Sequence, residues 1–260
     1  MSNRDSVKNT FLVTGLLCIV CSVLVSGAAV GLKEKQDTNK ELDLKKNILN
    51  VCGIPYEAEQ VEQVFTDRIS VRLINLNDGI AVTSTPESDQ TSSGFALNKL
   101  TANEKTELFS DPAGIGGARE NYAVVYLYPE KNQIILPIRG KGLWSTLWGF
   151  ISLSDDDFTT RGITFFQHGE TPGLGGEVDS AFFKDQFVAP KQTIGDDGQV
   201  ILNVTKSGAA GPNDIDGLAG ATITTQGVDK LIKFWLGENG FGKYLQSEDR
   251  FAEASPSASN

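Results

Sequence analysis

The sequence predicts an α+β protein: a mainly antiparallel sheet with packed helices, preceded by one N-terminal transmembrane helix. Three observations carry this prediction. The run Phe11–Leu32 has no charged residue, short β-branched or aromatic runs follow from Tyr122 onward, and an amphipathic helix pattern comes after the last of them. Short strands separated by turns indicate antiparallel pairing, and a helix able to cover them indicates an α+β domain.

The charge-free run Phe11–Leu32 is long enough to span a membrane. At about 1.5 Å per residue, a helix of this length reaches roughly 33 Å, which crosses a hydrocarbon core. A cleaved signal peptide is the alternative, because Arg4 and Lys8 precede the run and Ser26–Ala29 offers small residues for cleavage. The retained helix is favoured, because the run stays apolar through Val30 and Leu32.

The segments around this helix are less sharply marked. Lysines flank both ends, so the distribution of charge does not decide the orientation. Leucine and isoleucine near helical spacing after residue 41 predict a second helical segment, which Gly53 and Pro55 end. We therefore expect an N-terminal tail (1–10), the transmembrane helix (11–32) and a juxtamembrane helix (33–55).

The soluble region is expected to begin with a weakly patterned part, residues 56–121. Val61–Phe65 has a helical pattern, and Ile69–Ile74 alternates as a strand does. Ser84–Ser93 is rich in Ser, Thr, Pro and acidic residues, which predicts a surface loop without chemistry. The compact part is expected to begin near Tyr122.

From Tyr122 onward, turn residues separate short apolar runs that predict strands. The expected strands are Tyr122–Tyr128, Gln133–Ile138, Leu147–Leu153, Gly162–Gln167 and Val200–Val204. Apolar residues of the helix that follows recur at helical spacing: Val228, Leu231, Ile232, Trp235 and Leu236. Strands and helix together define an expected domain over 122–246, followed by a disordered tail over 247–260.

Composition excludes several classes of function. The formal net charge of −10 leaves no basic stripe for a nucleic-acid partner. The three cysteines, Cys18, Cys21 and Cys52, make no disulfide framework, and the first two are read as small packing residues rather than a redox or metal pair. His168 is the single histidine, which excludes a multi-histidine metal site. We expect no metal and read His168 as a strand-end residue.

The stretch Asp216–Thr225 stands directly before the amphipathic helix. Its threonines therefore lie at or near the first helical turn, where unpaired N–H groups and the helix dipole favour an anion by about 0.3–1 kcal/mol. This position is therefore expected to favour binding of a phosphate group. The alternative is that Thr224 or Thr225 only caps the helix.

Two glycine-rich turns lie earlier in the chain, at 139–145 and 168–177. Neither has the spacing of a Walker or dinucleotide motif. Glycine lets a backbone approach a flat ligand, so these turns, with Trp144 and Leu174, can form a slot for an aromatic ring system. The alternative for each is a tight connection. Glu170 and Glu177 have no nucleophile or metal cluster beside them, so we read them as pocket-edge or turn-stabilising residues and assign no catalytic residue.

The stretch 216–222 resembles the flavinylation motif of the FMN-binding domain family, Asp-x-x-(Ser/Thr)-Gly-Ala-Thr. In that family a flavin transferase joins the FMN phosphate to the motif threonine. Asp216, Gly220, Ala221 and Thr222 match, which implies that Thr222 is the acceptor, with Thr224 as the fallback. Ala219 departs from the pattern, because a hydroxyl residue normally stands there, and this puts one hydrogen bond near the linkage in doubt.

Further segments resemble the C-type subunit of the sodium-translocating NADH:quinone reductases, in the same order along the chain. These segments are Ala28–Leu32, Gly142–Ser145, Glu170–Glu177, Phe234–Gly237 and Gly240–Gly242. The related G-type subunit of the Rnf electron-transport complex shares the architecture and is the competing assignment. A membrane-anchored binding module without cofactor, in which Ala219 marks a decayed motif, is the third.

The resemblance implies one covalent FMN that relays electrons within a membrane complex, in which this chain alone does not turn over NADH. It implies these cofactor-binding residues: Thr222, Thr224, Gly220, Ala221, Gly142, Leu143, Trp144, Glu170, Thr171, Gly173, Leu174, Gly175 and Lys206. The implied partners are the other subunits of the complex, a flavin transferase and membrane lipid. The implied location is a bacterial inner membrane, with the soluble domain in the periplasm.

Overall fold

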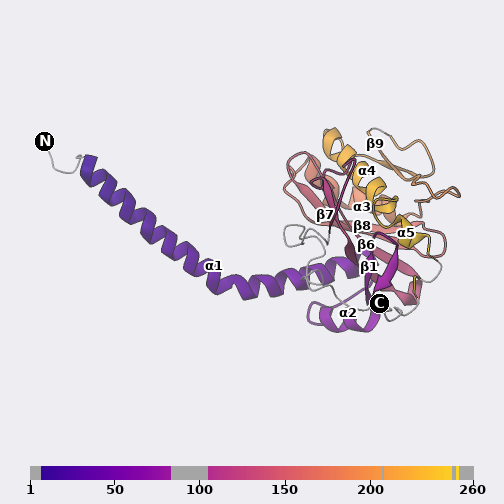
Figure 1. Cartoon of the computed structure of the whole chain (residues 1–260), viewed down its shortest axis with the longest axis horizontal. Coiled ribbons are helices and arrows are strands. Elements are labelled where there is room, and N and C mark those ends of the chain that lie inside the picture. Colours follow the sequence, from indigo (N-terminus) through magenta and orange to yellow (C-terminus); the bar gives the residue numbers. More distant parts are fainter. Residues whose placement is uncertain (1–6, 83–104, 207, 248–249, 252–260) are drawn as a thin grey trace. The chain divides into compact units, whose positions relative to one another are not determined.

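The computed structural model describes residues 7–82, 105–206, 208–247 and 250–251 (Figure 1). The chain divides into two compact units, Met1–Leu44 and Lys45–Asn260. The expected loop Ser84–Ser93 and most of the expected tail 247–260 lie outside the described residues. Residues 1–6 of the expected N-terminal tail also lie outside them.

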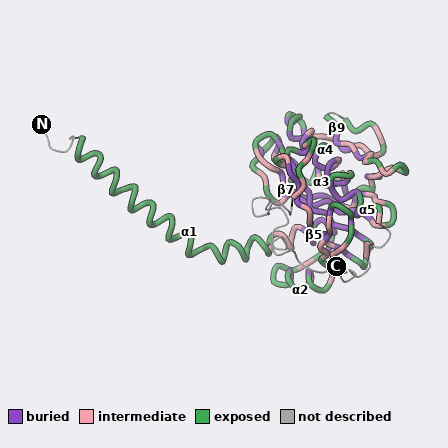
Figure 2. The backbone as a smooth tube through the Cα atoms, viewed as in Figure 1, coloured by how far each residue is buried: buried purple, intermediate pink, exposed green. Residues whose placement is uncertain are grey.

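Helix α1, Val7–Val51, runs without a break through the expected transmembrane segment (11–32) and through the expected juxtamembrane segment (33–55) as far as Val51. Its most apolar 18-residue window has a mean hydropathy of 2.4 and no buried residue, as the exposed colouring in Figure 2 shows. By length and composition, α1 is the one helix in the described part of the chain that can cross a membrane. It ends at Val51, and Gly53 follows with a positive φ of 65°, which favours glycine.

The second unit is built on a six-stranded antiparallel sheet with the order β2-β1-β5-β6-β7-β8. Its strands are β1 (Ser70–Asn75), β2 (Ile80–Val82), β5 (Tyr122–Tyr128), β6 (Gln133–Lys141), β7 (Thr146–Ser154) and β8 (Thr160–Gln167). The predicted α+β class with a mainly antiparallel sheet is confirmed. The compact fold nevertheless extends further toward the N-terminus than Tyr122, because β1 pairs with β5 along its whole length.

Two short strand pairs accompany this sheet. β3 (Lys105–Glu107) pairs antiparallel with β4 (Ala118–Glu120), and β9 (Asn203–Thr205) pairs parallel with β10 (Asp214–Asp216). The strand expected at Val200–Val204 is wrong in its first half. Val200 forms only an isolated bridge with Ile194 across a tight turn at Gly195–Gly198, so the strand begins at Asn203.

The helices of this unit cover both faces of the sheet. They are the last turns of α1 from Lys45 onward, α2 (Val61–Arg68), α3 (Ala181–Val188), α4 (Thr222–Leu236) and α5 (Gly242–Leu245), with 3₁₀ turns η4 (Pro129–Lys131) and η5 (Gly175–Asp179). Strand side chains alternate between faces, so Leu136 and Ile151 lie on one face, in the same hydrophobic cluster as α4, while their neighbours point the other way. On that other face, Phe65 of α2 contacts Tyr126, whose ring packs against Phe150.

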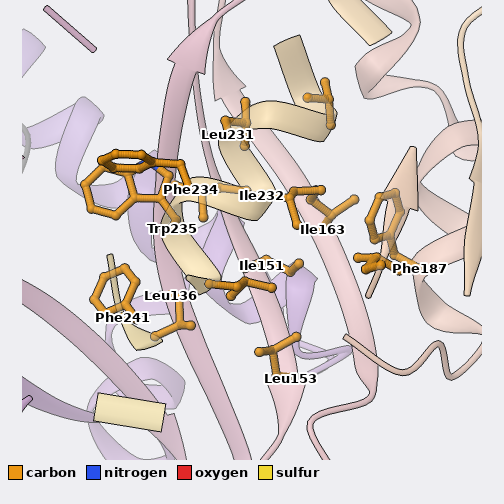
Figure 3. Close-up of a cluster of buried hydrophobic side chains, with 14 of the residues drawn as sticks. Leu136, Ile151, Leu153, Ile163, Phe187, Leu231, Ile232, Phe234, Trp235 and Phe241 are labelled. Atoms are coloured by element: carbon orange, nitrogen blue, oxygen red, sulfur yellow. The ribbon is translucent and has the colours of Figure 1, made fainter. Parts of the chain in front are cut away.

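The main core lies between α4 and the sheet (Figure 3). Leu231, Ile232 and Trp235 are almost fully buried against strand residues such as Leu136. Burying each of these side chains stabilises the fold by about 1.5–3 kcal/mol. The apolar stripe that predicted this helix is therefore the surface that fixes α4, and the threonines at its N-terminus, to the sheet.

A buried ion pair joins the two-stranded sheet of β3 and β4 to β6. Glu120 of β4 accepts hydrogen bonds from Arg139 of β6 through both carboxylate oxygens, at 2.5 and 2.6 Å. The Arg139 guanidinium also lies over the rings of Trp148 and Trp235, at 5.5 and 5.2 Å from their centroids. Arg139 thus belongs to a strand interior, and the glycine-rich turn that we expected to begin there begins at Gly142.

Candidate functional site

The threonine-rich stretch is held in place by the elements on both sides of it. β10 ends at Asp216, and the Gln186 side chain of α3 binds both backbone groups of that residue, accepting from its N–H at 2.7 Å and donating to its carbonyl at 3.2 Å. A Cβ at Gly217 would lie 2.1 Å from the Thr205 carbonyl oxygen. Gly220 has a positive φ of 72° and leads into α4. The approach to the helix therefore has little conformational freedom.

The three threonines at the start of α4 have different surroundings. Thr222, the first helical residue, is exposed. Thr224 is buried and donates its hydroxyl to Glu170 Oε2 at 2.7 Å. Thr225 is buried as well, and its Oγ1 accepts from the Leu218 N–H at 2.9 Å. Of these three hydroxyls, only that of Thr222 lies at the surface.

The N-terminus of α4 is suited to a phosphate. The N-cap residue is Ala221, which has no side-chain acceptor to offer. Among the described residues, none accepts a hydrogen bond from the backbone N–H groups of Thr222, Ile223 or Thr224. These three donors and the positive end of the helix dipole favour an anion beside the Thr222 hydroxyl.

The two glycine-rich turns meet at the Glu170 carboxylate. Its Oε1 accepts from the backbone N–H groups of Trp144 (2.9 Å) and Ser145 (3.0 Å), and from Ser145 Oγ (3.3 Å). Its Oε2 accepts from the Leu143 N–H (3.2 Å) and from the Thr224 hydroxyl. A Cβ at Gly142 or Gly175 would lie 2.6 or 2.7 Å from this carboxylate, so both glycines are needed for close packing.

Large apolar side chains remain exposed around this meeting point. Leu143 and Trp144 are 43% and 68% exposed, and Leu174 and Ile223 are 45% and 55% exposed. A Cβ on Gly220 would contact Leu174 at 3.2 Å, so the second turn reaches the threonine-rich stretch. An exposed apolar cluster beside an anion site fits a ligand with a flat ring and a phosphate.

Hydrogen bonds hold Glu170 as a carboxylate. Burial raises the pKa of Glu170, but the hydrogen bonds from Thr224, Trp144, Ser145 and Leu143 outweigh burial and hold the pKa below its ordinary value of 4.5. The neighbouring His168 accepts from the Glu170 N–H at Nδ1 (3.3 Å), and its Nε2 lies 2.7 Å from Asp179 Oδ2. His168 therefore helps to orient the second turn.

This pKa predicts an acid-sensitive contribution to stability. A group whose folded-state pKa is depressed stabilises the fold above its unfolded pKa, and this contribution is lost as the pH falls through the folded pKa. Urea unfolding of the full chain in detergent, followed by circular dichroism, should show wild type more stable than Glu170→Gln at pH 7. The difference in the free energy of unfolding between the two proteins should become smaller toward pH 3. A difference that stays constant over this range would contradict the prediction.

Comparison with known proteins identifies the family. Residues 142–237, which include both turns and α4, match the FMN-binding domain family. The C-type subunit (NqrC) of the Na(+)-translocating NADH-quinone reductase of Yersinia pestis is 41% identical over 255 residues, which cover 94% of each chain. The chain belongs to the NqrC family. The Vibrio alginolyticus member is 40% identical over 250 residues, with 94% of this chain and 96% of that one covered.

Solved NqrC structures have the same fold. The crystal structure of Shewanella oneidensis NqrC superposes with a TM-score of 0.71 at 24% identity, covering 80% of this chain and 97% of that one. The homologous structure from Parabacteroides distasonis gives 0.63 at 26% identity, covering 84% and 98%. The similarity to the Shewanella oneidensis structure shows the fold alone. Both similarities agree with the sheet and helices described above.

In this member of the NqrC family, most of the residues expected at the site lie together. Leu143, Trp144, Leu174 and Thr222 are exposed around the buried Glu170, while Thr171 supplies the carbonyl that accepts from the N–H groups of Leu174 and Gly176. Gly173 has a positive φ of 76°, as the second turn requires. Lys206 is exposed and directly follows β9, whose Thr205 pairs with Asp216, so it lies beside the threonine-rich stretch. Ala219 is exposed in that stretch.

Some features of the site were not foreseen from the sequence. Gln186 lies on α3, a helix that the sequence pattern did not predict. Ile223 lies outside the buried apolar stripe of α4 and adds to the exposed apolar cluster. An apolar residue out of phase with the apolar face of its helix is the signal that could have found it.

A cavity of about 580 Å³, lined by Phe158, Leu236 and Arg250 among others, includes none of the expected site residues.

Proposed function

We propose that this chain is the covalent flavoprotein subunit of a Na⁺-translocating NADH-quinone reductase, with FMN joined as a phosphoester to Thr222. The observation that carries the proposal is the exposed Thr222 hydroxyl at the N-terminus of α4, beside three N–H groups with no acceptor among the described residues. The buried Thr224 hydroxyl, engaged by Glu170, argues against the fallback acceptor.

Each residue of the site has a role in this proposal. The N–H groups at the start of α4 bind phosphate oxygens, and the Lys206 ammonium adds positive charge nearby. Gly220 and Ala221 leave room for the ribityl chain. Leu143, Trp144 and Leu174 cover a ring face and keep water from it, with Gly142, Thr171, Gly173 and Gly175 shaping the two turns. When bound, FMN supplies one-electron transfer between neighbouring redox centres.

Helix α1 supports a membrane location for this chemistry, because it is long and apolar enough to span a bilayer. We infer that α1 anchors the protein in the lipid of a bacterial inner membrane, with the unit Lys45–Asn260 in the periplasm beside the other subunits of the reductase. A flavin transferase is the partner that matures it. Covalent attachment suits such a site, because a cofactor lost outside the membrane could not be recaptured from a flavin pool.

The proposal is tested by measuring covalently bound flavin in protein purified from cells that contain the flavin transferase. Denatured wild-type protein should keep flavin fluorescence in a gel. Trypsin cleavage at Lys206 and Lys230 releases peptide 207–230, which should carry one FMN residue. This peptide also contains Thr224 and Thr225, so fragment-ion spectra are needed to assign the linkage to Thr222. A colourless protein with an unmodified peptide would overturn the proposal.

A further inference from the structure

Glu170 connects two parts of the site that are far apart in sequence. Its Oε1 binds only the turn Gly142–Ser145, whereas its Oε2 binds both that turn, through Leu143, and α4, through Thr224. The side chain that makes these contacts is 5% exposed. Leu143 and Trp144 project from the turn, and Thr222 lies one helical turn or less from Thr224 on α4.

The surroundings of Glu170 require a carboxylate. Three of its five donors are consecutive backbone N–H groups, which cannot rotate to become acceptors and which together form an anion-binding nest. Among the described residues, no lysine or arginine pairs with Glu170. The three backbone N–H groups and the hydroxyls of Ser145 and Thr224 are therefore the groups that stabilise its charge. A glutamine of the same shape would turn an NH₂ group toward at least one of the backbone N–H groups, losing that bond.

The base of the turn is fixed independently of Glu170. A Cβ at Gly227 of α4 would lie 2.3 Å from the Lys141 carbonyl oxygen, so the end of β6 packs directly on the helix. Beyond that point, Ser145 Oγ accepts from the Gly169 N–H at 2.7 Å, and the Gly142 N–H donates to the Ser145 carbonyl at 2.8 Å. Neither of these bonds reaches α4. Among the described residues, the hydrogen bonds that connect the tip of the turn, Leu143–Ser145, to α4 therefore run through the Glu170 carboxylate.

We propose that Glu170 is a positioning residue that ties the turn bearing Leu143 and Trp144 to the first turn of α4, setting the distance between the ring-covering side chains and Thr222. The inference rests on the proposed function for its consequence, but the tie itself exists whether or not a flavin is attached. Glu170 does not contact the flavin in this role. It acts through the backbone that it binds.

The tie is tested first without flavin, in a Thr222→Ala background of the full chain in detergent. Adding Glu170→Gln should raise hydrogen exchange of the amides in peptides covering 142–146 by about tenfold or more, because bonds to a charged acceptor are lost. Peptides covering 231–236 should exchange as before, which shows that the fold persists. Glu177→Gln is the matched control: Glu177 lies in the same turn as Glu170, but it is exposed, and among the described residues its carboxylate accepts from one backbone N–H, that of Gly173.

Two changes at Thr224 separate the tie from packing. Thr224→Val removes the donor hydroxyl but keeps the side-chain shape, so exchange at 142–146 should rise. Thr224→Ser keeps the hydroxyl and should restore slow exchange. If Glu170→Gln and Thr224→Val both leave exchange at 142–146 unchanged, the proposal is overturned.

The consequence for the flavin is tested in protein that keeps Thr222 and therefore the attachment site. Glu170→Gln should keep covalent flavin in the denatured gel but change flavin fluorescence in the folded protein and shift the flavin's reduction potential. Glu238→Gln, at an exposed residue after α4 that has no role in the site, should leave both unchanged. Unaltered fluorescence and potential in Glu170→Gln would refute the positioning role. Wild-type protein without any covalent flavin would instead refute the proposed function and leave the exchange result standing, so the two failures are distinguishable.

Discussion

Thr222→Ala is expected to abolish covalent flavin completely while leaving the fold intact. The substitution removes the oxygen to which the phosphoester is assigned, and no other threonine hydroxyl at the start of α4 is exposed. Thr222 is a surface residue, and the helix N-cap is Ala221, so the cost in stability should stay within about 0.5 kcal/mol. In-gel flavin fluorescence after denaturation, beside thermal unfolding of the same samples, measures both quantities.

Two further variants make this result specific. Thr222→Ser keeps a hydroxyl at the same place and should keep at least part of the flavin. Thr224→Ala removes the hydroxyl bound to Glu170 and should also keep the flavin, because the acceptor remains. Persistent fluorescence in Thr222→Ala, or its loss in Thr224→Ala alone, would move the linkage to Thr224 and contradict the assignment made from exposure.

The choice between these threonines marks where prediction from sequence stops at this site. The motif placed a threonine at a helix N-terminus, because both the motif and the apolar stripe of α4 are local patterns. Which hydroxyl faces solvent depends on contacts from elsewhere. Thr224 is engaged by a residue 54 positions earlier in the chain, which no spacing within the motif can reveal.

The same division applies to the fold. Strands β5 to β8 follow one another in sequence and in the sheet, so their runs and turns were sufficient to predict them. β1 lies beside β5 only because the chain returns after a long excursion, and this pairing carried no local signal. Helix α3 was missed because its apolar residues do not mark one face: Phe183 and Phe187 are buried, whereas Phe182 and Val188 are exposed. The Ser180 N-cap nevertheless marks its start.

Glu120→Leu is expected to lower the free energy of unfolding by about 3–5 kcal/mol, because it removes the carboxylate that neutralises a buried guanidinium. Glu120 and Arg139 are 1% and 2% exposed, so water cannot replace the lost partner without opening the core. Arg139 lies two residues before the Lys141–Gly227 contact, and its carbonyl accepts from Trp235 Nε1 at 2.7 Å. Urea unfolding monitored by circular dichroism measures the change.

The double variant Glu120→Leu with Arg139→Met decides whether charge is the cause. Replacing both members of a buried ion pair by apolar residues of similar volume is often neutral, so the double variant should regain much of the stability lost in the single one. Glu107→Leu, at the exposed residue of the neighbouring strand β3, should change stability by less than about 0.5 kcal/mol and controls for the loss of a carboxylate from this small sheet. If the double variant is as unstable as the sum of both single variants, the pair contributes through shape rather than charge.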